Sequence, residues 1–138
     1  MQNNLRTKFK SKVLSLGMDL SEIDALSLSL PQTELTTPFD PTTLVYKVAG
    51  KMFLMIDLDN PVVIAVKCQP ERAELLRERY CEITPAYHMN KRHWNNIRLD
   101  GDLPKELICD EIRRSYRLVV DKLPSSVRAS LAAHAPND

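Results

Sequence analysis

The sequence predicts an α+β fold in two layers, in which a mostly antiparallel sheet of five strands has helices on one face. The predicted elements run in the order helix, three strands, helix, two strands and one or two helices. The first three strands are separated by only a few residues, whereas parallel strands would need a crossover of a dozen or more. The chain has 138 residues and no internal repeat, which fits a single domain.

The first 17 residues contain four cations and no acid, and we expect residues 1–17 to form a disordered basic extension. The single folded domain is then expected over residues 18–138. Without these four side chains, 15 basic residues remain against 18 acidic ones, a formal charge of about −3. A surface of the domain that binds anions must therefore be a local concentration of positive charge. The four cations are Arg6, Lys8, Lys10 and Lys12.

A helix is predicted after residue 18, because Asp19 or Ser21 can act as its N-cap. Apolar residues follow at spacings of three or four, which places them on one face of the helix. These residues are Leu20, Ile23, Leu26 and Leu30. Pro31 ends the helix, and the proline-containing residues 33–41 are predicted to form a connecting loop.

Three strands are predicted over residues 44–48, 52–57 and 62–67, which are rich in Val, Ile, Phe and Tyr. Turns around Gly50 and Asn60 join them into an antiparallel meander.

Side chains alternate between the two faces of a strand, so the charged residues of the meander mark its outward face. The residues expected in the core are Leu44, Tyr46, Val48, Met52, Leu54, Ile56, Val62, Ile64 and Val66. Those expected on the outward face are Val45, Lys47, Phe53, Met55, Val63, Ala65 and Lys67. This outward face is more apolar than an ordinary hydrated face.

A second helix is predicted to begin at Pro70, because the first turn of a helix needs no backbone donor. Pro85 forbids its continuation, and a short strand near Ile83 and a longer strand over residues 94–99 follow. Alternation in the longer strand points three side chains outward: Trp94, Asn96 and Arg98.

The longest helix is predicted to begin near Asp102 and Pro104 and to end before Pro124. Its buried face consists of Ile108, Ile112, Ser115, Val119 and Leu123. A weaker helix over residues 125–134 completes the order.

Residues 85–104 hold the only Trp and two of the three His, in the sequence PAYHMNKRHWNNIRLDGDLP. The motif residues in this stretch are His88, Asn90, Lys91, His93, Trp94, Asp100 and Gly101. Together with the Pro-Phe-Asp-Pro at residues 38–41, this motif resembles the signature of the MmcQ/YjbR family of small bacterial proteins. The resemblance covers residues 18–124. It implies a double-wing fold, similar to secretion chaperones and to the frataxin-like CyaY fold, and DNA binding as the family's usual function.

A basic and aromatic surface is the candidate site for nucleic acid. Strand alternation places several cations and two aromatic residues on the outward face, which would suit phosphates and a stacked base. The cations are Lys47, Lys67, Lys91, Arg92 and Arg98, and the aromatic residues are Phe53 and Trp94. A hydrated basic loop with the tryptophan packed against the sheet is an equally good interpretation of the same residues.

Three further arginines belong to the longest helix: Arg113, Arg114 and Arg117. Asp110 and Asp121 lie three or four residues from them, so we expect mutually neutralised surface pairs.

The sequence offers little for catalysis or for a metal. Cys68, Cys81 and Cys109 are widely spaced without a C-x-x-C pair, which indicates neither a disulfide framework nor a zinc site and fits a reducing cytoplasm. His88 and His93 are expected to order their loop through hydrogen bonds rather than to bind metal. No nucleophile elbow, P-loop or dinucleotide fingerprint is present in the sequence, so we expect no enzyme and no cofactor.

We therefore predict a non-enzymatic, cytoplasmic binding protein of the MmcQ/YjbR type with DNA as its partner. The alternative is a protein-interaction or chaperone-like module that docks a client, or a second copy of itself, on the exposed sheet face. A third hypothesis is a protein that binds a small molecule or confers resistance, which rests on a family member in an antibiotic gene cluster. No membrane partner is expected, because no apolar run reaches the roughly 20 residues of a membrane span.

Overall fold

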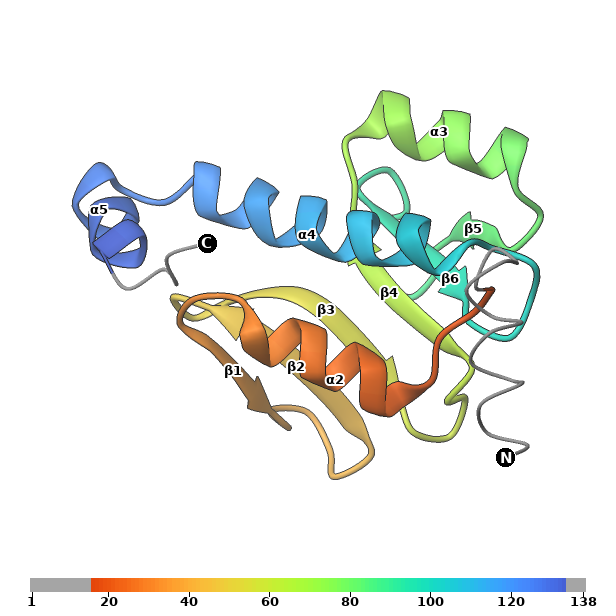
Figure 1. Ribbon diagram of the computed structural model, residues 1–138, viewed down its shortest axis with the longest axis horizontal. Coiled ribbons are helices and arrows are strands. Elements are labelled where there is room, and N and C mark those ends of the chain that lie inside the picture. Colours follow the sequence, from red (N-terminus) through yellow and green to blue (C-terminus); the bar gives the residue numbers. More distant parts are fainter. Residues whose placement is uncertain (1–15, 134–138) are drawn as a thin grey trace, which may run out of the picture.

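The computed structural model describes residues 16–133 and contains helices and six strands in that range (Figure 1). The helices are α2 (Leu20–Ser29), α3 (Pro70–Arg79), α4 (Lys105–Asp121) and α5 (Ser125–Ala133). The strands are β1 (Thr33–Thr36), β2 (Thr43–Val48), β3 (Lys51–Asp57), β4 (Val63–Lys67), β5 (Ile83–Pro85) and β6 (Trp94–Arg98). All neighbouring strands are antiparallel, in the order β1-β2-β3-β4-β6-β5. The predicted α+β class is confirmed.

The helices and the sheet form two layers. Figure 1 shows α2 and α4 on one side of the sheet, where α4 contacts β2, β3 and β4 and α2 contacts β1, while α3 flanks β5 at the other edge. We call the opposite side the helix-free face, because no described helix packs on it. Residues 86–93, between β5 and β6, fold over part of this face and bring Ala86 and Met89 against Ala65 and Trp94.

Helix α2 begins as its sequence indicates. The Asp19 carboxylate accepts a hydrogen bond from the backbone N–H of Glu22 at 2.9 Å, and the Glu22 side chain accepts one from the Asp19 N–H. This reciprocal capping box satisfies two backbone donors that the first turn leaves free. Ile23 is fully buried, so the predicted apolar face of the helix is the one that packs on the core.

Strand β1 lies where the sequence predicted a connecting loop, and it raises the strand count from five to six. Pro31 and Pro38 lie outside the four residues of β1, so neither removes a donor from its ladder with β2. Gln32 has a φ of 58°, a left-handed conformation that reverses the chain between α2 and β1. A short edge strand tolerates such surroundings, because it pairs on one side only.

Apolar side chains pack in two separate clusters, one on each face of the sheet. The larger cluster lies between the sheet and the helices and includes Ile23, Tyr46, Phe53, Leu54, Ile56, Ile64, Ile97, Ile108 and Ile112. The smaller cluster lies on the helix-free face and consists of Ala65, Ala86 and Trp94, with Met52, Met55 and Met89 packed against them.

A β-bulge between β2 and β3 moves Phe53 to the opposite face from the one predicted. Tyr46 pairs with Leu54, but Lys47 pairs with Met52, so Phe53 is the extra residue of β3. Its ring is fully buried under the helices and makes an edge-on contact with a tyrosine of α4 at 5.4 Å between ring centroids. The expectation that Phe53 points outward is therefore wrong. Met52, expected in the core, packs instead on the helix-free face.

Of the expected basic extension, only Leu16 and Gly17 lie among the described residues. The Gly17 N–H donates to the carbonyl of Leu103 at 2.9 Å, and the Met18 N–H donates to that of Leu99 at 3.2 Å. Gly17 has a φ of 69°, and a Cβ there would lie 2.5 Å from the Leu99 carbonyl oxygen. This close approach requires glycine, and residues 16–18 are thereby attached to the turn that precedes α4.

Candidate functional site

Six cations surround one end of the sheet, where β3 begins, β4 and α4 end, and β6 begins. We call this set the basic end; it consists of Lys47, Lys51, Lys67, Lys91, Arg92 and Lys122. Cross-strand pairing sets Lys67 beside Trp94 and Lys47 beside Met52, all on the helix-free face. The Cys68 N–H donates to the His93 carbonyl at 2.8 Å, which brings residues 91–93 to the end of β4. None of the six forms an ion pair with another described residue.

Lys67 lies at the centre of the basic end. Its Nζ is 5.8 Å from the centroid of the Trp94 ring, a cation–π distance. Burial lowers the pKa of Lys67 below its ordinary value of 10.5, and the positive charges of Lys122 and Lys51 lower it further. The charges that act on Lys67 are thus other lysines, and a bound anion would reverse their effect.

Trp94 is a core residue of the helix-free face. The side chain is 5% exposed, and Ala86 and Met89 from residues 86–93 pack against it. Little of the indole is left for a base to stack on. Tyr87, which the sequence did not single out, is 71% exposed and is the aromatic ring of this region that is open to solvent.

Arg98 shares the helix-free face with Lys67 but lies at the far end of β6, paired in the ladder with Val63. Its Nε donates to a carboxylate oxygen of Asp100 at 2.6 Å. This contact raises the pKa of Arg98 and lowers that of Asp100. The structure therefore does not bring Arg98 together with the other predicted cations, because four residues of strand and a carboxylate separate it from them.

The motif histidines do not order their loop as the sequence suggested. His88 and His93 are exposed, and neither ring forms a hydrogen bond with another described residue. Arg77 of α3 does this instead: its Nε donates to Asn95 Oδ1 at 2.7 Å, and its Nη2 donates to the carbonyls of Lys91 and Trp94. Nothing in the sequence around Arg77 marks this role in the loop, which depends on contacts between α3 and residues distant in the chain.

The Asp100-Gly101 part of the motif has a structural explanation. A carboxylate oxygen of Glu82 accepts a hydrogen bond from the Asp102 N–H at 2.8 Å, which lowers the pKa of Glu82. A Cβ on Gly101 would lie 2.6 Å from the Glu82 side chain. Glycine at this position lets Glu82 reach the turn before α4.

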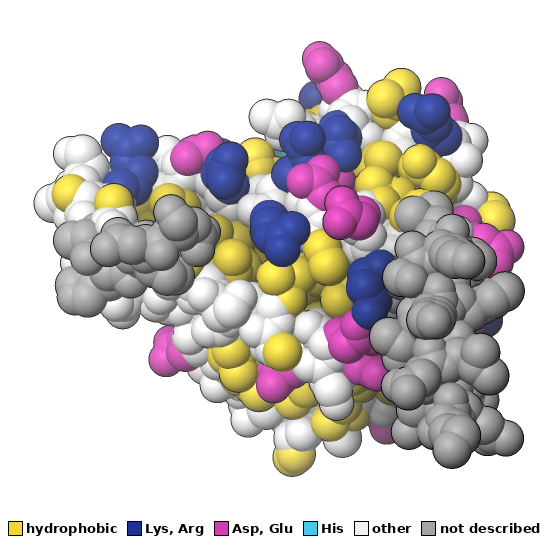
Figure 2. Space-filling model, viewed as in Figure 1, with side chains coloured by type: hydrophobic (Ala, Val, Ile, Leu, Met, Phe, Trp, Pro, Cys, Tyr) yellow, Lys and Arg dark blue, Asp and Glu magenta, His cyan; other side chains and the backbone are white. Residues whose placement is uncertain are grey.

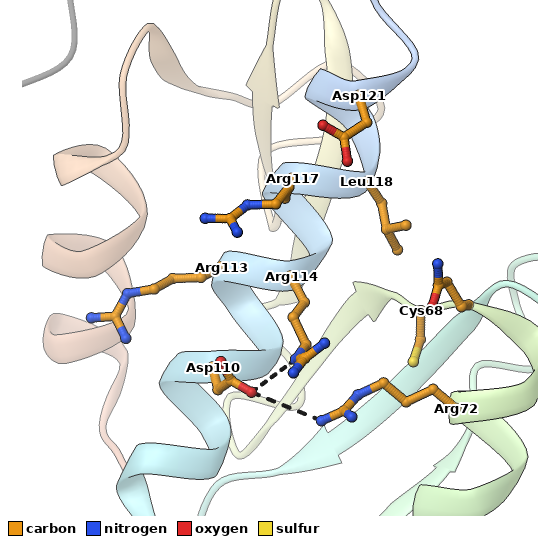
Figure 3. A pocket seen from close by; sticks show the side chains of 9 residues that line it. Cys68, Arg72, Asp110, Arg113, Arg114, Arg117, Leu118 and Asp121 are labelled. Carbon is orange, nitrogen blue, oxygen red and sulfur yellow. Dashed lines mark hydrogen bonds and ion pairs between the residues drawn. The ribbon is translucent and has the colours of Figure 1, made fainter. Parts of the chain in front are cut away.

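A second basic region is the groove between α3 and α4, with a volume of about 280 Å³ (Figure 3). Its arginines are Arg72, Arg113, Arg114 and Arg117. Figure 3 shows Arg72 and Arg114 reaching toward Asp110, while Arg113 and Arg117 extend away from them. The distances to Asp110 are 3.8 Å from Arg72 and 2.8 Å from Arg114. The predicted pairing on α4 is therefore confirmed for Arg114 alone, and it is wrong for Arg113 and Arg117, which form no ion pair with a described residue. Asp121 forms no ion pair with a described residue.

Beneath this groove lies a carboxylate that the sequence did not reveal. Glu111 is 1% exposed and accepts two hydrogen bonds from Arg72, at 3.1 Å from Nε and 2.7 Å from Nη2. Burial and the charge of Glu111 raise the pKa of the neighbouring Cys68 to about 11, so this thiol stays protonated at neutral pH. The groove arginines that point inward are therefore neutralised by the protein itself.

The described residues contain no group of three or more His, Cys, Asp or Glu side chains arranged to hold a metal ion. Between residues 16 and 133, no helix has both the length and the apolar character of a membrane span.

Comparison with known proteins gives consistent matches along most of the chain. The YjbR family model matches residues 28–118. The uncharacterised protein YjbR of Escherichia coli K12 is 33% identical over 115 residues, which are 83% of this chain and 98% of that protein. The uncharacterised protein YbdF of Escherichia coli O157:H7 is 38% identical over 99 residues, or 71% and 81% of the two chains.

Two solved structures share the fold. A crystal structure of a Deinococcus radiodurans protein with a DUF419 domain superposes with a TM-score of 0.79 at 34% identity, over 87% of this chain and 92% of that one. A Pseudomonas syringae protein superposes with a TM-score of 0.63 at 29% identity, over 73% and 98%.

Proposed function

We propose that this chain, which belongs to the YjbR family, binds DNA by holding the phosphate backbone at the basic end of its sheet. The observation that supports this function is the absence of carboxylate partners for the six cations of the basic end among residues 16–133. A cation contributes to DNA affinity when it replaces the counterions of a phosphate, which requires a charge that the protein has not already neutralised.

The helix side offers a poorer surface for a polyanion. Figure 2 shows its Lys and Arg side chains interspersed with Asp and Glu side chains across the helices. Arg72 and Arg114 bind protein carboxylates, and Lys105 pairs with Glu22. A phosphate that approaches this side meets carboxylates as well as cations, so its net attraction is small.

The framework of the basic end suits a fixed array of charges. Lys47, Lys51 and Lys67 are attached to paired strands, and the Arg77 side chain ties residues 91–94 to α3. Because these elements are rigid, the cations can contact several phosphates without a large cost in conformational entropy. We expect a binding role without catalysis; the Cys68 thiol beside Glu111 stays protonated at neutral pH and is therefore a poor nucleophile. DNA as a partner also favours the cytoplasm.

Replacement of Lys91 and Arg92 together by Ala tests this function. Binding of a duplex, a DNA single strand and an RNA of equal length is measured by fluorescence anisotropy at several salt concentrations. We expect weaker binding to each ligand that the wild type binds and a salt slope lower by about 2, since each phosphate contact contributes roughly 0.9. Both side chains are exposed, so the free energy of unfolding should change by less than about 0.5 kcal/mol.

The matched control is the double variant Arg113→Ala, Arg117→Ala on the helix side. These two arginines also lack ion pairs among the described residues, and we expect their loss to leave the salt slope close to that of the wild type. A slope that falls with this control and not with the Lys91 and Arg92 variant would move the DNA surface to α4. Absence of salt-dependent binding, with self-association on size exclusion, would favour the protein-interaction alternative. That alternative has less support from the fold, because residues 86–93 cover the apolar centre of the helix-free face.

A further inference from the structure

A pocket of about 260 Å³ lies on the helix-free face and extends from Ala65 toward the end of the sheet opposite the basic end, where Asp57 and Val63 line it. The sheet forms its floor with Met55 and Ala65, and residues 86–93 form a wall with Ala86 and Met89. Lys67 of the basic end is two residues from Ala65 along β4, a distance of about 7 Å. A single strand that extends from the basic end therefore reaches the near side of the pocket within one nucleotide, and Asp57 and Asn60 line its far side.

Polar side chains with unused hydrogen-bonding groups surround this apolar floor. The side chains of Asn60, His88 and Asn96 line the pocket, and none of them forms a hydrogen bond with another described residue. Asp57 lines it as well and uses one carboxylate oxygen to accept from the Asp59 N–H at 2.9 Å, which leaves the other oxygen available. An apolar floor with a few convergent polar groups is the usual composition of a ligand site.

We infer that this pocket takes one unpaired nucleobase from a DNA single strand whose phosphates lie on the basic end. The inference rests on the proposed function and specifies its substrate. Sites for drug-sized ligands have volumes of roughly 300 to 1,000 Å³, and this pocket is smaller. Its size suits one nucleobase. Proteins that recognise single strands place splayed bases against apolar or aromatic side chains and read their edges by hydrogen bonds.

The polar groups also select among the bases. The Asp57 carboxylate accepts hydrogen bonds and donates none, so it favours a base with an exocyclic amino group. The Asn96 amide offers a donor and an acceptor side by side, which matches the edge of adenine. Thymine presents carbonyl oxygens where adenine and cytosine present amino groups, and these oxygens would face the carboxylate. Adenine and cytosine should therefore bind better than thymine.

The test compares oligothymidylate of about six nucleotides with the same strand carrying one central adenine. Anisotropy titrations are run at one salt concentration with the wild type, Asn96→Leu, Asp57→Asn and the control Thr84→Val. Thr84 pairs with Asn96 across β5 and β6 but does not line the pocket. We expect the wild type and the control to bind the adenine strand about tenfold more tightly than oligothymidylate. Asn96→Leu should abolish this preference, and Asp57→Asn should narrow it by improving thymine binding.

The possible failures are distinct. Equal affinity of the wild type for both strands, or a preference that Asn96→Leu leaves intact, would overturn the pocket while the proposed function stands. No binding of either strand or of a duplex would overturn the proposed function, and the inference with it. Loss of folding in Asn96→Leu would show as an altered circular dichroism spectrum. In that case Asp57→Asn alone tests the pocket, because asparagine keeps an oxygen that can accept the hydrogen bond from the Asp59 N–H.

Discussion

The groove between α3 and α4 contains four arginines and the basic end of the sheet contains six cations, yet the two regions differ less in number than in what their charges already bind. In the groove, Arg72 and Arg114 are bound by Asp110 and the buried Glu111. At the basic end, the strongest influences on Lys67 are its burial and two other lysines. Positive charge on a surface is thus available to a ligand only where the protein has not already paired it.

The two regions also differ in what holds them in place. The groove depends on an ion pair, in which a buried carboxylate needs its arginine partner. The basic end depends on an apolar cluster around Trp94, on which the cations themselves have little influence. Substitutions at the supporting residues should therefore cost far more stability than substitutions at exposed cations.

Trp94→Ala should have the largest effect. The side chain is 5% exposed and forms the centre of the smaller apolar cluster, so its truncation should lower the free energy of unfolding by about 4 kcal/mol. Urea denaturation measures this loss, with Tyr87→Ala as an aromatic control from the exposed part of the same loop. The control should change stability by less than about 0.5 kcal/mol. A Trp94 variant of nearly wild-type stability would mean that the indole is not packed on the sheet.

Arg72→Ala should have the next largest effect, about 3 kcal/mol, because it leaves the Glu111 carboxylate buried without its main partner. Arg114 is 3.9 Å from the same carboxylate and offsets part of the cost. Arg113→Ala, on α4 across the same groove and without an ion pair among the described residues, is the control and should be nearly neutral.

The double variant Arg72→Met, Glu111→Leu distinguishes the contribution of the buried ion pair to stability from the contribution of side-chain packing at the same positions. It removes both charges and fills the space with apolar side chains, so it should recover more than half of the stability that Arg72→Ala loses. Additive losses from the two positions would show that Arg72 and Glu111 are not coupled.

Much of the fold could be predicted from the sequence, because its local signals agree with one another. Proline positions, capping residues and strand alternation gave the helices and five of the six strands. The exceptions depend on pairing between strands. The bulge opposite Tyr46 and Lys47 reverses the face of Phe53, and no residue in the sequence marks that bulge. Strand β1 was not predicted because prolines lie on both sides of it. An edge strand pairs with one neighbour only and tolerates such flanking residues.

The candidate site was predictable in part. Alternation correctly placed Lys47, Lys67 and Trp94 on one face. The sequence could not show that residues 86–93 fold over Trp94, or that Lys122, the C-cap of α4, reaches the same end of the sheet as Lys67. Both facts arise from packing between elements distant in the chain. Asp100 is only two residues from Arg98, and this spacing could have indicated their ion pair.

The smallest expected effect concerns the pKa of Lys67, which tests whether the cations of the basic end, unlike those of the groove, lack a carboxylate partner. Its pKa is lowered by burial, then by Lys122 and Lys51, so Lys122→Ala should raise that pKa toward 10.5. The unfolded chain keeps the proton to higher pH, so stability increases as pH rises from the lowered pKa to 10.5. Lys122→Ala should flatten this increase, and an oligonucleotide bound at the basic end should raise the Lys67 pKa in both proteins. NMR titration of the Lys67 side chain measures these shifts, with Lys105→Ala as a control whose lysine pairs with Glu22. A Lys67 that titrates at or above 10.5 in the free wild type would mean that a carboxylate already neutralises the basic end, as in the groove.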